Sequence, residues 1–388
     1  MYRNIHVEID LDVIGQNVTN ILNQYNNYDY YIGVVKGNAY GHGFGVIPTM
    51  IARGINYLAV SSLDEAFAVR QYDQMIPVLI MEPVSHLELT VCEQNNFTVT
   101  ISSYEYWQVF MGYNFNHLKI HLKLDTGLNR LGVDSKTKFE EMFHGILGKS
   151  GTQLEGVFTH LATTGVLDDL YDKQIAKFSE LTAGVNLREI PMVHIGRSAT
   201  LETKKKLPFV NGVRMGALMF GINQIFRPYT GIKGRLRKFR DERIKSRLNI
   251  TPSYESSSLV VNHGFSLKAE IIEVNKLYAG ETVGYGGTFK ADKDTYIAVL
   301  PIGYADGLLT TYRHAKVAIN GKLYRVVGII NMCMVTVEVD ANVRAGDVAT
   351  LIGELAHVKK IAAATGQNAY VVMTQIAKEI PRYYKGGN

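Results

Sequence analysis

The first 216 residues alternate between short apolar, β-branched runs and amphipathic stretches, and this alternation limits the possible folds more than any other feature. Stretches of helical period, such as 46–53, 62–72 and 169–181, lie between most of the runs. Eight such alternations predict an α/β fold, a parallel (β/α)8 TIM-type barrel with its helices outside. A doubly wound open sheet is the main alternative. The eight predicted strands span residues 31–36, 57–61, 77–81, 97–101, 118–124, 154–160, 192–195 and 209–215.

The ends of the predicted strands favour the barrel over the open sheet. Reactive side chains stand at or just after the carboxyl ends of most of them: Lys36, Ser61, Glu82, Lys123 with Asp125, His160, Ser198 and Arg214. In a parallel barrel these ends converge on one face, where active sites lie. Each residue alone is more often structural than catalytic, so their shared position carries the inference.

The pattern changes after residue 258 to short alternating strands separated by glycine turns, which predicts a mostly antiparallel β domain. A chain of 388 residues suits two domains. We expect a barrel over 1–222, a basic linker or insertion over 223–257 and the β domain over 258–388. The strands of that domain are expected at 267–274, 296–300, 316–319, 324–330, 334–339 and 348–352, with a helix at 358–365.

Composition and charge limit the cellular compartment and the kinds of partner that we expect for this protein. Cys92 and Cys333 cannot build a disulfide framework, no signal peptide is apparent, and no uncharged apolar stretch is long enough to span a bilayer, so we expect a cytoplasmic protein. Residues 227–247 hold nine Lys/Arg against two acids, and this +7 segment leaves −2 for the rest of the +5 chain. Membrane or general nucleic-acid affinity is therefore not indicated. We interpret the segment as a solvated helix or loop and leave its role open.

Residues 31–43 combine a buried apolar run, a lysine and a glycine-rich loop. Lys36 ends the run and three glycines follow within seven residues. A lysine at the end of a buried strand is poorly solvated, which favours the neutral amine that attacks an aldehyde cofactor. The glycines let the backbone approach a ligand closely. The alternative is a lysine that reaches solvent beside a flexible loop.

Residues 36–43, Lys-Gly-Asn-Ala-Tyr-Gly-His-Gly, resemble the cofactor-lysine motif of the alanine racemases. The resemblance implies that Lys36 carries pyridoxal 5'-phosphate (PLP) and that Tyr40 contacts its phosphate. Residues 123–132, Lys-Leu-Asp-Thr-Gly-Leu-Asn-Arg-Leu-Gly, are similar to a second motif of that family. There the resemblance implies that Arg130 holds the substrate carboxylate, as its planar fork suits. It leaves open whether Lys123 is carbamylated to orient Arg130.

Further matches imply the remaining cofactor contacts. By resemblance, His160 supports the cofactor ring, Ser198 binds the phosphate and Tyr370 touches the phosphate and narrows the substrate path. The backbone N–H groups of Gly216 and Ala217 are further candidate phosphate donors.

Residues 213–221, Val-Arg-Met-Gly-Ala-Leu-Met-Phe-Gly, are similar to the segment that faces the cofactor ring nitrogen in this family. An arginine there, Arg214, does not yield its proton, so the nitrogen stays unprotonated. The cofactor is then a weaker electron sink, and transamination is suppressed.

The β domain carries the second half of the resemblance, and it also holds a departure. Tyr285 matches the family's second catalytic base, which the partner subunit supplies, although Gly284 replaces a serine. Met332 keeps the backbone N–H expected to bind the substrate carboxylate. Cys333 stands where the family tends to have aspartate, and Arg197 where it usually has asparagine. Both departures bear on substrate choice more than on the reaction.

The resemblance covers nearly the whole chain and implies a homodimeric, PLP-dependent amino acid racemase that interconverts L- and D-alanine. Lys36 and Tyr285 of the partner subunit would act on opposite faces of Cα, as inversion requires. A racemase of serine or lysine and a non-catalytic PLP-binding or interaction protein remain alternatives. A metal-dependent hydrolase would need a cluster such as His-x-His after the first strand, and His42 stands alone, so we expect no metal.

Overall fold

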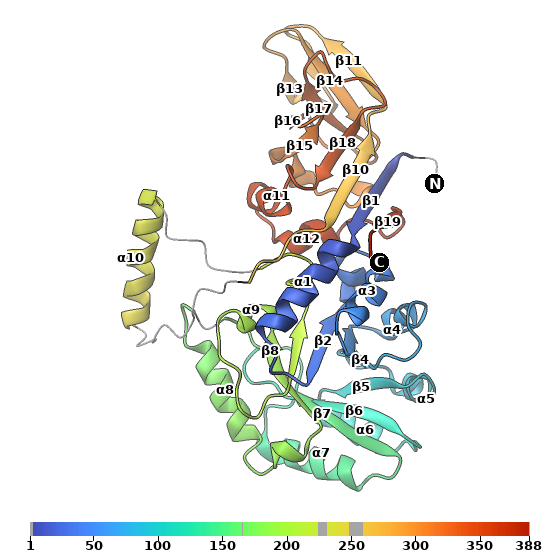
Figure 1. Cartoon of the computed structure of the whole chain (residues 1–388), viewed down its shortest axis with the longest axis vertical. Helices are drawn as coiled ribbons and strands as arrows, with labels where there is room; N and C mark the ends of the chain where they lie inside the picture. Colours follow the sequence, from blue (N-terminus) through green and yellow to red (C-terminus); the bar gives the residue numbers. More distant parts are fainter. Residues whose placement is uncertain (1–2, 165, 224–230, 248–258, 388) are drawn as a thin grey trace.

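The computed structural model describes residues 3–164, 166–223, 231–247 and 259–387, and it contains a closed barrel and a large sheet (Figure 1). The barrel confirms the predicted parallel architecture: each strand pairs with the next in sequence, and β2 also pairs with β9. The alternative of an open sheet is thereby excluded. Its strands are β2 (Tyr30–Val34), β3 (Tyr57–Val60), β4 (Val78–Ile80), β5 (Phe97–Ile101), β6 (Leu118–Lys123), β7 (Thr152–Phe158), β8 (Met192–Arg197) and β9 (Gly212–Met215).

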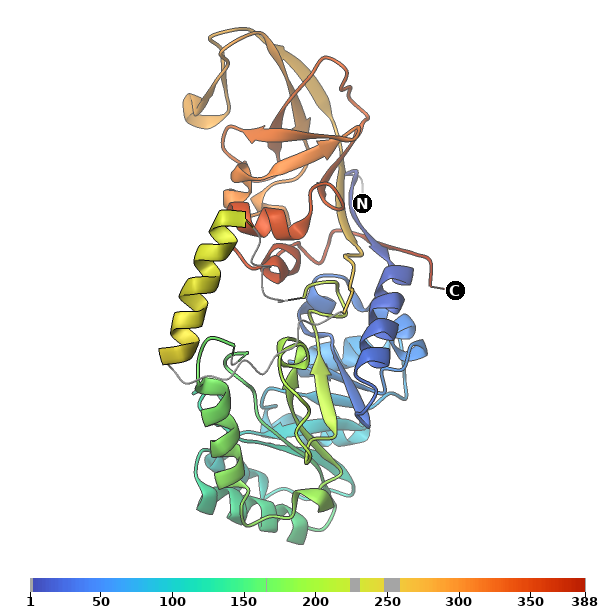
Figure 2. The same ribbon diagram turned by 60° about the vertical axis from the view of Figure 1, so that its left-hand side comes forward.

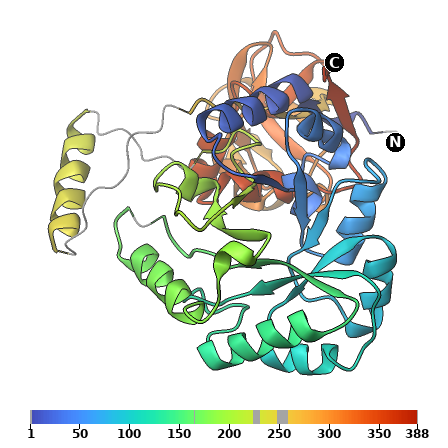
Figure 3. The ribbon, with the colours of Figure 1, turned by 60° about the horizontal axis from the view of Figure 1, so that its bottom comes forward.

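Helices surround the barrel on its outside (Figure 3). Local sequence explains their limits, because Ser62, Ser103 and Ser135 each accept a hydrogen bond from a backbone N–H in the first turn of the helix that follows. The helices are α1 (Leu11–Gln24), α2 (Lys36–Tyr40), α3 (Ile47–Ala52), α4 (Leu63–Arg70), α5 (Leu89–Gln94), α6 (Tyr104–Phe110), α7 (Lys136–Gly148), α8 (Leu170–Leu181) and α9 (Ser198–Leu201), with 3₁₀ turns η1 (Phe44–Val46), η2 (His86–Glu88) and η3 (Leu187–Glu189).

The second part is a sheet in the order β11-β14-β17-β16-β15-β18-β10-β1-β19, in which only the β1–β19 pair is parallel. This confirms the mostly antiparallel β domain. A small ribbon of β12 (Thr282–Val283) and β13 (Phe289–Lys290) accompanies it. The sheet strands are β1 (Ile5–Asp10), β10 (Phe265–Glu270), β11 (Glu273–Leu277), β14 (Thr295–Leu300), β15 (Lys316–Ile319), β16 (Lys322–Val327), β17 (Val335–Val339), β18 (Val348–Ile352) and β19 (Arg382–Lys385).

Two features of this sheet differ from the sequence analysis. The predicted strand 267–274 is wrong as one element, because β10 ends at Glu270 and β11 begins at Glu273 on a different partner. Strand β1 lies within the sequence range assigned to the barrel, yet it pairs with β10 and β19. Its side chains at 5, 7 and 9 are buried, whereas Glu8 faces outward and forms ion pairs with Lys268 (2.7 Å) and Lys385 (2.8 Å).

The red C-terminal helices lie between the sheet and the barrel in Figure 2, and the C-terminal segment contacts the loop that follows Lys36. The Arg382 guanidinium donates to the carbonyl of Gly41 (3.2 Å), and the Tyr384 hydroxyl donates to the carbonyl of His42 (3.2 Å). Helix α12 also lies beside α2. The elements here are α11 (Val358–Thr365), which matches the predicted helix, and α12 (Ala369–Thr374), with 3₁₀ turns η4 (Tyr285–Gly287), η5 (Tyr304–Asp306) and η6 (Thr310–His314).

The basic segment contains a helix, α10 (Gly231–Arg247), which Figures 1 and 3 show standing apart from the barrel. Its large apolar side chains Ile232, Leu236 and Phe239 are exposed. Residues 224–230 and 248–258 of the predicted insertion lie outside the described residues. Within the described parts of the chain, no helix is long and apolar enough to cross a membrane.

Candidate active site

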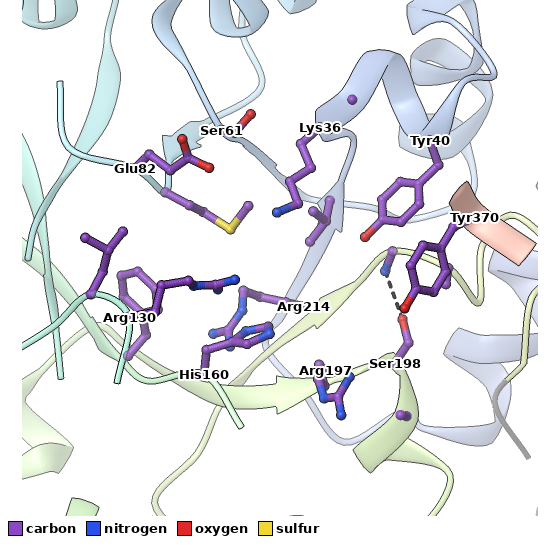
Figure 4. A pocket seen from close by; sticks show the side chains of 18 of the residues that line it. Lys36, Tyr40, Ser61, Glu82, Arg130, His160, Arg197, Ser198, Arg214 and Tyr370 are labelled. Atoms are coloured by element: carbon purple, nitrogen blue, oxygen red, sulfur yellow. Dashed lines mark hydrogen bonds between the residues drawn. The ribbon is translucent and has the colours of Figure 1, made fainter. Parts of the chain in front are cut away.

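A cavity of about 930 Å³ opens at the carboxyl ends of the barrel strands (Figure 4). Ten of the twelve predicted site residues line it: Lys36, Tyr40, Lys123, Arg130, His160, Ser198, Arg214, Gly216, Ala217 and Tyr370. Ser61 and Glu82, singled out by their strand-end positions, also line it. Tyr285 and Met332 do not, and their side chains are 74% and 58% exposed on the β domain. One chain therefore assembles the predicted site without Tyr285 and Met332.

Lys36 and Tyr40 are brought into the cavity by an unusual turn. From Gly37 to Tyr40 the φ angles lie between 51° and 64°, so α2 is left-handed. A left-handed residue with a side chain costs about 1–2 kcal/mol, and strain of this kind gathers at functional sites. The Glu65 carboxylate supports the turn by accepting from the Gly37 N–H (2.6 Å) and the Ser61 N–H (2.9 Å). As a result, the Lys36 amine and the Tyr40 hydroxyl point into the same space (Figure 4).

One end of the cavity collects neutral hydrogen-bond donors. Ser198, at the start of α9, accepts from the Gly216 N–H (3.0 Å), and the Tyr40 and Tyr370 side chains lie beside it (Figure 4). A Cβ atom at position 216 would lie 2.4 Å from the Tyr40 hydroxyl oxygen, so only glycine leaves room for that ring. Burial raises the pKa of Tyr40 to about 12, which keeps its hydroxyl a donor at neutral pH. Such a cradle suits a phosphate group.

Arg214, on β9, also lines the cavity and is 3% exposed. Its guanidinium donates to His194 Nδ1 (2.6 Å) and to the carbonyls of His194 (2.8 Å), Thr159 (2.7 Å) and Ile195 (3.1 Å). Burial, and then Arg197, lower its pKa to about 9, so it stays charged at neutral pH. No described carboxylate forms an ion pair with it. The cavity thus presents a rigid cation to any ring placed against it.

His160 stands next to Arg214, with 3.4 Å between His160 Nδ1 and the Arg214 guanidinium. Burial lowers the pKa of His160 to about 2, and the positive charge of Arg214 acts in the same direction. The imidazole is therefore neutral at physiological pH and can only pack against or hydrogen-bond to a ligand, as the predicted support of a cofactor ring requires.

Lys123 and Arg130 come from one segment that Asp125 organises. The Asp125 carboxylate accepts from the backbone N–H groups of residues 127–130, at 2.8 to 3.0 Å. This turn sends the exposed Arg130 over the cavity (Figure 4). Lys123 is buried, and burial, followed by the charges of Arg130 and Arg214, lowers its pKa to about 8. A partly neutral buried lysine between two arginines is therefore present.

The sequence analysis did not identify part of this site. It assigned no role to Val34, Met81, Leu131 or Phe158, which supply much of the apolar wall. Their strand-end positions were a usable signal, but apolar residues at such positions are ordinary. It also gave no role to His194, the immediate partner of Arg214. Among the described residues, no group of three or more His, Cys, Asp or Glu side chains is arranged to hold a metal ion.

Comparison with known proteins follows this division of the chain. Residues 9–224 match the family model for the alanine racemase N-terminal domain, and residues 264–384 match the one for the C-terminal domain. The chain is 31% identical to alanine racemase 1 of Bacillus subtilis, over 99% of this chain and 93% of that protein. It is 29% identical to an alanine racemase of Streptococcus equi, over 99% of both.

Solved structures agree with the sequence comparison. The alanine racemase of Bacillus anthracis with bound L-Ala-P superposes with a TM-score of 0.85 at 27% identity, and covers 100% of this chain and 97% of that one. Both family models match, and between them they span the barrel, the cavity and the β domain. The chain therefore belongs to the alanine racemase family, whose members are isomerases.

Proposed function

We propose that this protein is a PLP-dependent alanine racemase that works with two bases. The observation that carries the proposal is the cavity itself, in which a lysine amine, a group of hydroxyl and N–H donors and a buried arginine surround one space, and no described carboxylate forms an ion pair with that arginine. The relatives named above are alanine racemases, and this chain matches them over almost their full length, which supports alanine as the substrate.

The residues present fit PLP. Lys36 would hold its aldehyde carbon, and His160 would lie beside the ring. Arg214 would face the ring nitrogen. The phosphate would be bound by the hydroxyls of Tyr40, Ser198 and Tyr370 and by the N–H groups of Gly216 and Ala217. When bound, PLP stabilises negative charge at the Cα atom of an attached amino acid.

The chain's own residues then handle the substrate and its protons. Arg130 and the backbone N–H of the partner subunit's Met332 would hold the carboxylate, which fixes the direction of the Cα–H bond. The Lys36 amine takes or returns the proton on one face of Cα. Tyr285 of the partner subunit does so on the other, so the configuration inverts.

Arg214 selects racemisation over transamination. A guanidinium donates and does not accept, so it leaves the ring nitrogen opposite it unprotonated. With PLP bound, less charge would spread into the ring, and this would favour return of the proton to Cα. The four polar groups around Arg214 keep it in place during this step.

A homodimer with shared active sites follows from the same assignment. Tyr285 and Met332 are exposed and outside their own chain's cavity, which is what a contribution to a second chain requires. The ribbon of β12 and β13 carries Tyr285 at its tip, on the 3₁₀ turn η4. This placement supports the proposal that two cavities are each completed by the opposite β domain.

The direct test is exchange of the α-hydrogen in D₂O, followed by chiral chromatography, with L-alanine, L-serine and L-lysine. Racemisation of alanine with deuterium incorporation is expected. Faster serine or lysine turnover would instead favour altered specificity, for which Cys333 and the cavity residue Arg197 are the reason. Bound PLP without any exchange would refute racemase activity.

Loss of the Ser198 hydroxyl should weaken PLP binding about tenfold or more, because a hydrogen bond to a charged group contributes about 1.5–3 kcal/mol. Equilibrium dialysis of Ser198→Ala with PLP measures this. Pyridoxal, which lacks the phosphate, is the matched probe and should bind wild type and variant alike. An equal loss for both ligands would mean that Ser198 shapes the fold and not the phosphate site.

Lys123 is expected to react with CO₂, since its pKa of about 8 leaves a large neutral fraction at pH 8. The amine nitrogen bonds to the carbon and releases a proton, so acidification below pH 7 should reverse the reaction. NMR with ¹³C-bicarbonate should give a carbamate signal at pH 8 that Lys123→Arg lacks. Lys119→Arg, on the same strand, should keep it. A signal that survives in Lys123→Arg would exclude this site.

A further inference from the structure

A series of buried hydrogen bonds leads from Arg214 down through the barrel. Arg214 contacts His194 Nδ1 (2.6 Å), and His194 Nε2 lies 2.9 Å from His121 Nδ1. His121 Nε2 lies 3.2 Å from the Glu155 carboxylate. Both histidine side chains are fully buried. The series thus joins the Arg214 cation on β9 to the Glu155 carboxylate on β7. The two histidines between them lie on β8 and β6.

The donors and acceptors in this series allow one arrangement of protons. Arginine only donates, so His194 Nδ1 must accept and its proton must be on Nε2. His194 Nε2–H then donates to His121 Nδ1, which leaves the His121 proton on Nε2, pointing at Glu155. A proton on His121 Nδ1 would set two N–H groups against each other across 2.9 Å. Both imidazoles are therefore neutral, and every bond points toward the carboxylate.

The surroundings of Glu155 stabilise its carboxylate as the last hydrogen-bond acceptor of the series. The Tyr57 hydroxyl (2.6 Å) and the Thr98 hydroxyl (3.0 Å) also donate to it, and Lys119 lies 3.9 Å away. Burial by itself would raise the pKa of Glu155, but the hydrogen bonds from His121, Tyr57 and Thr98 lower it, and the lowering prevails. The carboxylate is consequently charged at any pH at which the enzyme would work.

Two backbone features leave space for the His121 ring in this series of hydrogen bonds. The pairing of β6 with β7 shifts so that His121 faces Gly156 and Glu155 is skipped, a bulge of the kind that redirects side chains. A Cβ atom at Gly156 would lie 2.6 Å from the His121 ring, so any larger residue would displace the imidazole. The Phe158 ring stacks on His194, with ring centroids 4.6 Å apart and planes 12° from parallel. The two imidazoles are thus held by packing as well as by hydrogen bonds.

We propose that Glu155 is a remote positioning residue for the racemase reaction, which acts through His121 and His194 to hold the Arg214 guanidinium at the cofactor ring nitrogen. It is not a catalytic residue, because it lies outside the cavity lining. Without its charge, His121 is free to take the other tautomer. His194 must then follow, and an N–H would face Arg214 and displace it. The role of Arg214 at the cofactor ring nitrogen rests on the proposed function. The arrangement of protons along the series does not depend on it.

The first measurement is ¹⁵N NMR of the histidine side chains in the intact PLP-loaded enzyme. We expect both His121 and His194 to have an unprotonated Nδ1 and a protonated Nε2. The variants His121→Asn and His194→Asn assign the two signals. A proton on Nδ1 of either residue in the wild-type protein would overturn the proposal without reference to any variant of Glu155, even if the protein bound no PLP.

The variant Glu155→Gln removes the charge and keeps the size of the side chain. We expect mixed tautomers at His121, an altered absorption spectrum of bound PLP, a fall in kcat of about tenfold or more with KM unchanged, and more pyruvate formed per alanine racemised. Thr100→Val is the matched control, since it removes a buried hydroxyl from the same strand as Thr98 but outside the series. Unchanged tautomers and spectrum in Glu155→Gln, or the same changes in Thr100→Val, would refute the role of Glu155.

Discussion

Replacement of Lys36 by alanine is expected to reduce alanine racemisation by about 10³-fold or more, because one side chain is lost from two tasks. The amine would both hold PLP and carry the proton on one face of Cα. The other described lysine of the cavity, Lys123, is buried at the end of β6 beside the Phe158 ring, and we do not expect it to take over both tasks. Chiral chromatography measures the rate, and borohydride reduction measures covalently bound PLP, which should be absent.

Added methylamine should restore part of the activity of Lys36→Ala, because a small amine can enter the space left by the side chain and accept the proton. The control is Lys173→Ala, which removes an exposed lysine whose ion pair with Asp169 contributes little. It should keep both the rate and the bound cofactor. Racemisation by Lys36→Ala at a rate close to wild type would exclude Lys36 as the base, and trapped PLP in that variant would assign the cofactor to another lysine.

Replacement of Tyr285 by phenylalanine is expected to lower racemisation by about 10²–10⁴-fold, the usual contribution of a positioned acid or base. The loss should be one-sided. Lys36 would still exchange the α-hydrogen of one enantiomer with solvent, whereas no residue would deliver a proton to the other face of Cα. Exchange in D₂O, followed separately from each enantiomer, measures this asymmetry. Tyr278→Phe is the control, since this tyrosine is also exposed on the β domain.

A mixture of the two inactive variants tests whether Tyr285 serves the opposite chain. In a dimer of one Lys36→Ala chain and one Tyr285→Phe chain, one site would lose both bases and the other would keep both. Random assortment of equal amounts should therefore restore about a quarter of the wild-type sites. No recovery, although the chains exchange, would show that Tyr285 acts within its own chain and would remove the argument for shared sites.

Much of the fold could be predicted from local patterns. The eight barrel strands were all located, and β15, β18 and α11 have the predicted limits. Apolar runs predict strands that are buried on both faces, and stretches of helical period predict helices with one buried face. Both predictions depend only on the spacing of apolar residues along the chain, and the barrel buries residues with these spacings. Lys36, Lys123, His160, Ser198 and Arg214 could be predicted for a related reason, because they stand at strand ends and a closed parallel barrel brings such ends together. Tyr370, on α12, was predicted by the family resemblance instead.

Other features depend on pairings between distant segments. The pairing of β1 with β10 and β19 could not be predicted, because the residues of a strand do not specify which distant strands will pair with it. The left-handed turn after Lys36 was equally unexpected, since Asn38, Ala39 and Tyr40 adopt φ angles that their side chains disfavour. That conformation persists because the Glu65 carboxylate and the C-terminal segment hold it.

The amino-acid sequence by itself determined the barrel, the β domain, the family and the position of the reactive side chains along the chain. Only the tertiary structure decided what those side chains face. His121 and His194 are 73 residues apart in sequence, and Glu155 lies between them on another strand. They become one series because barrel closure and the bulge in β7 align them, and because an arginine at one end and a carboxylate at the other leave a single arrangement of protons. Such an arrangement depends on contact geometry, which composition and periodicity do not encode.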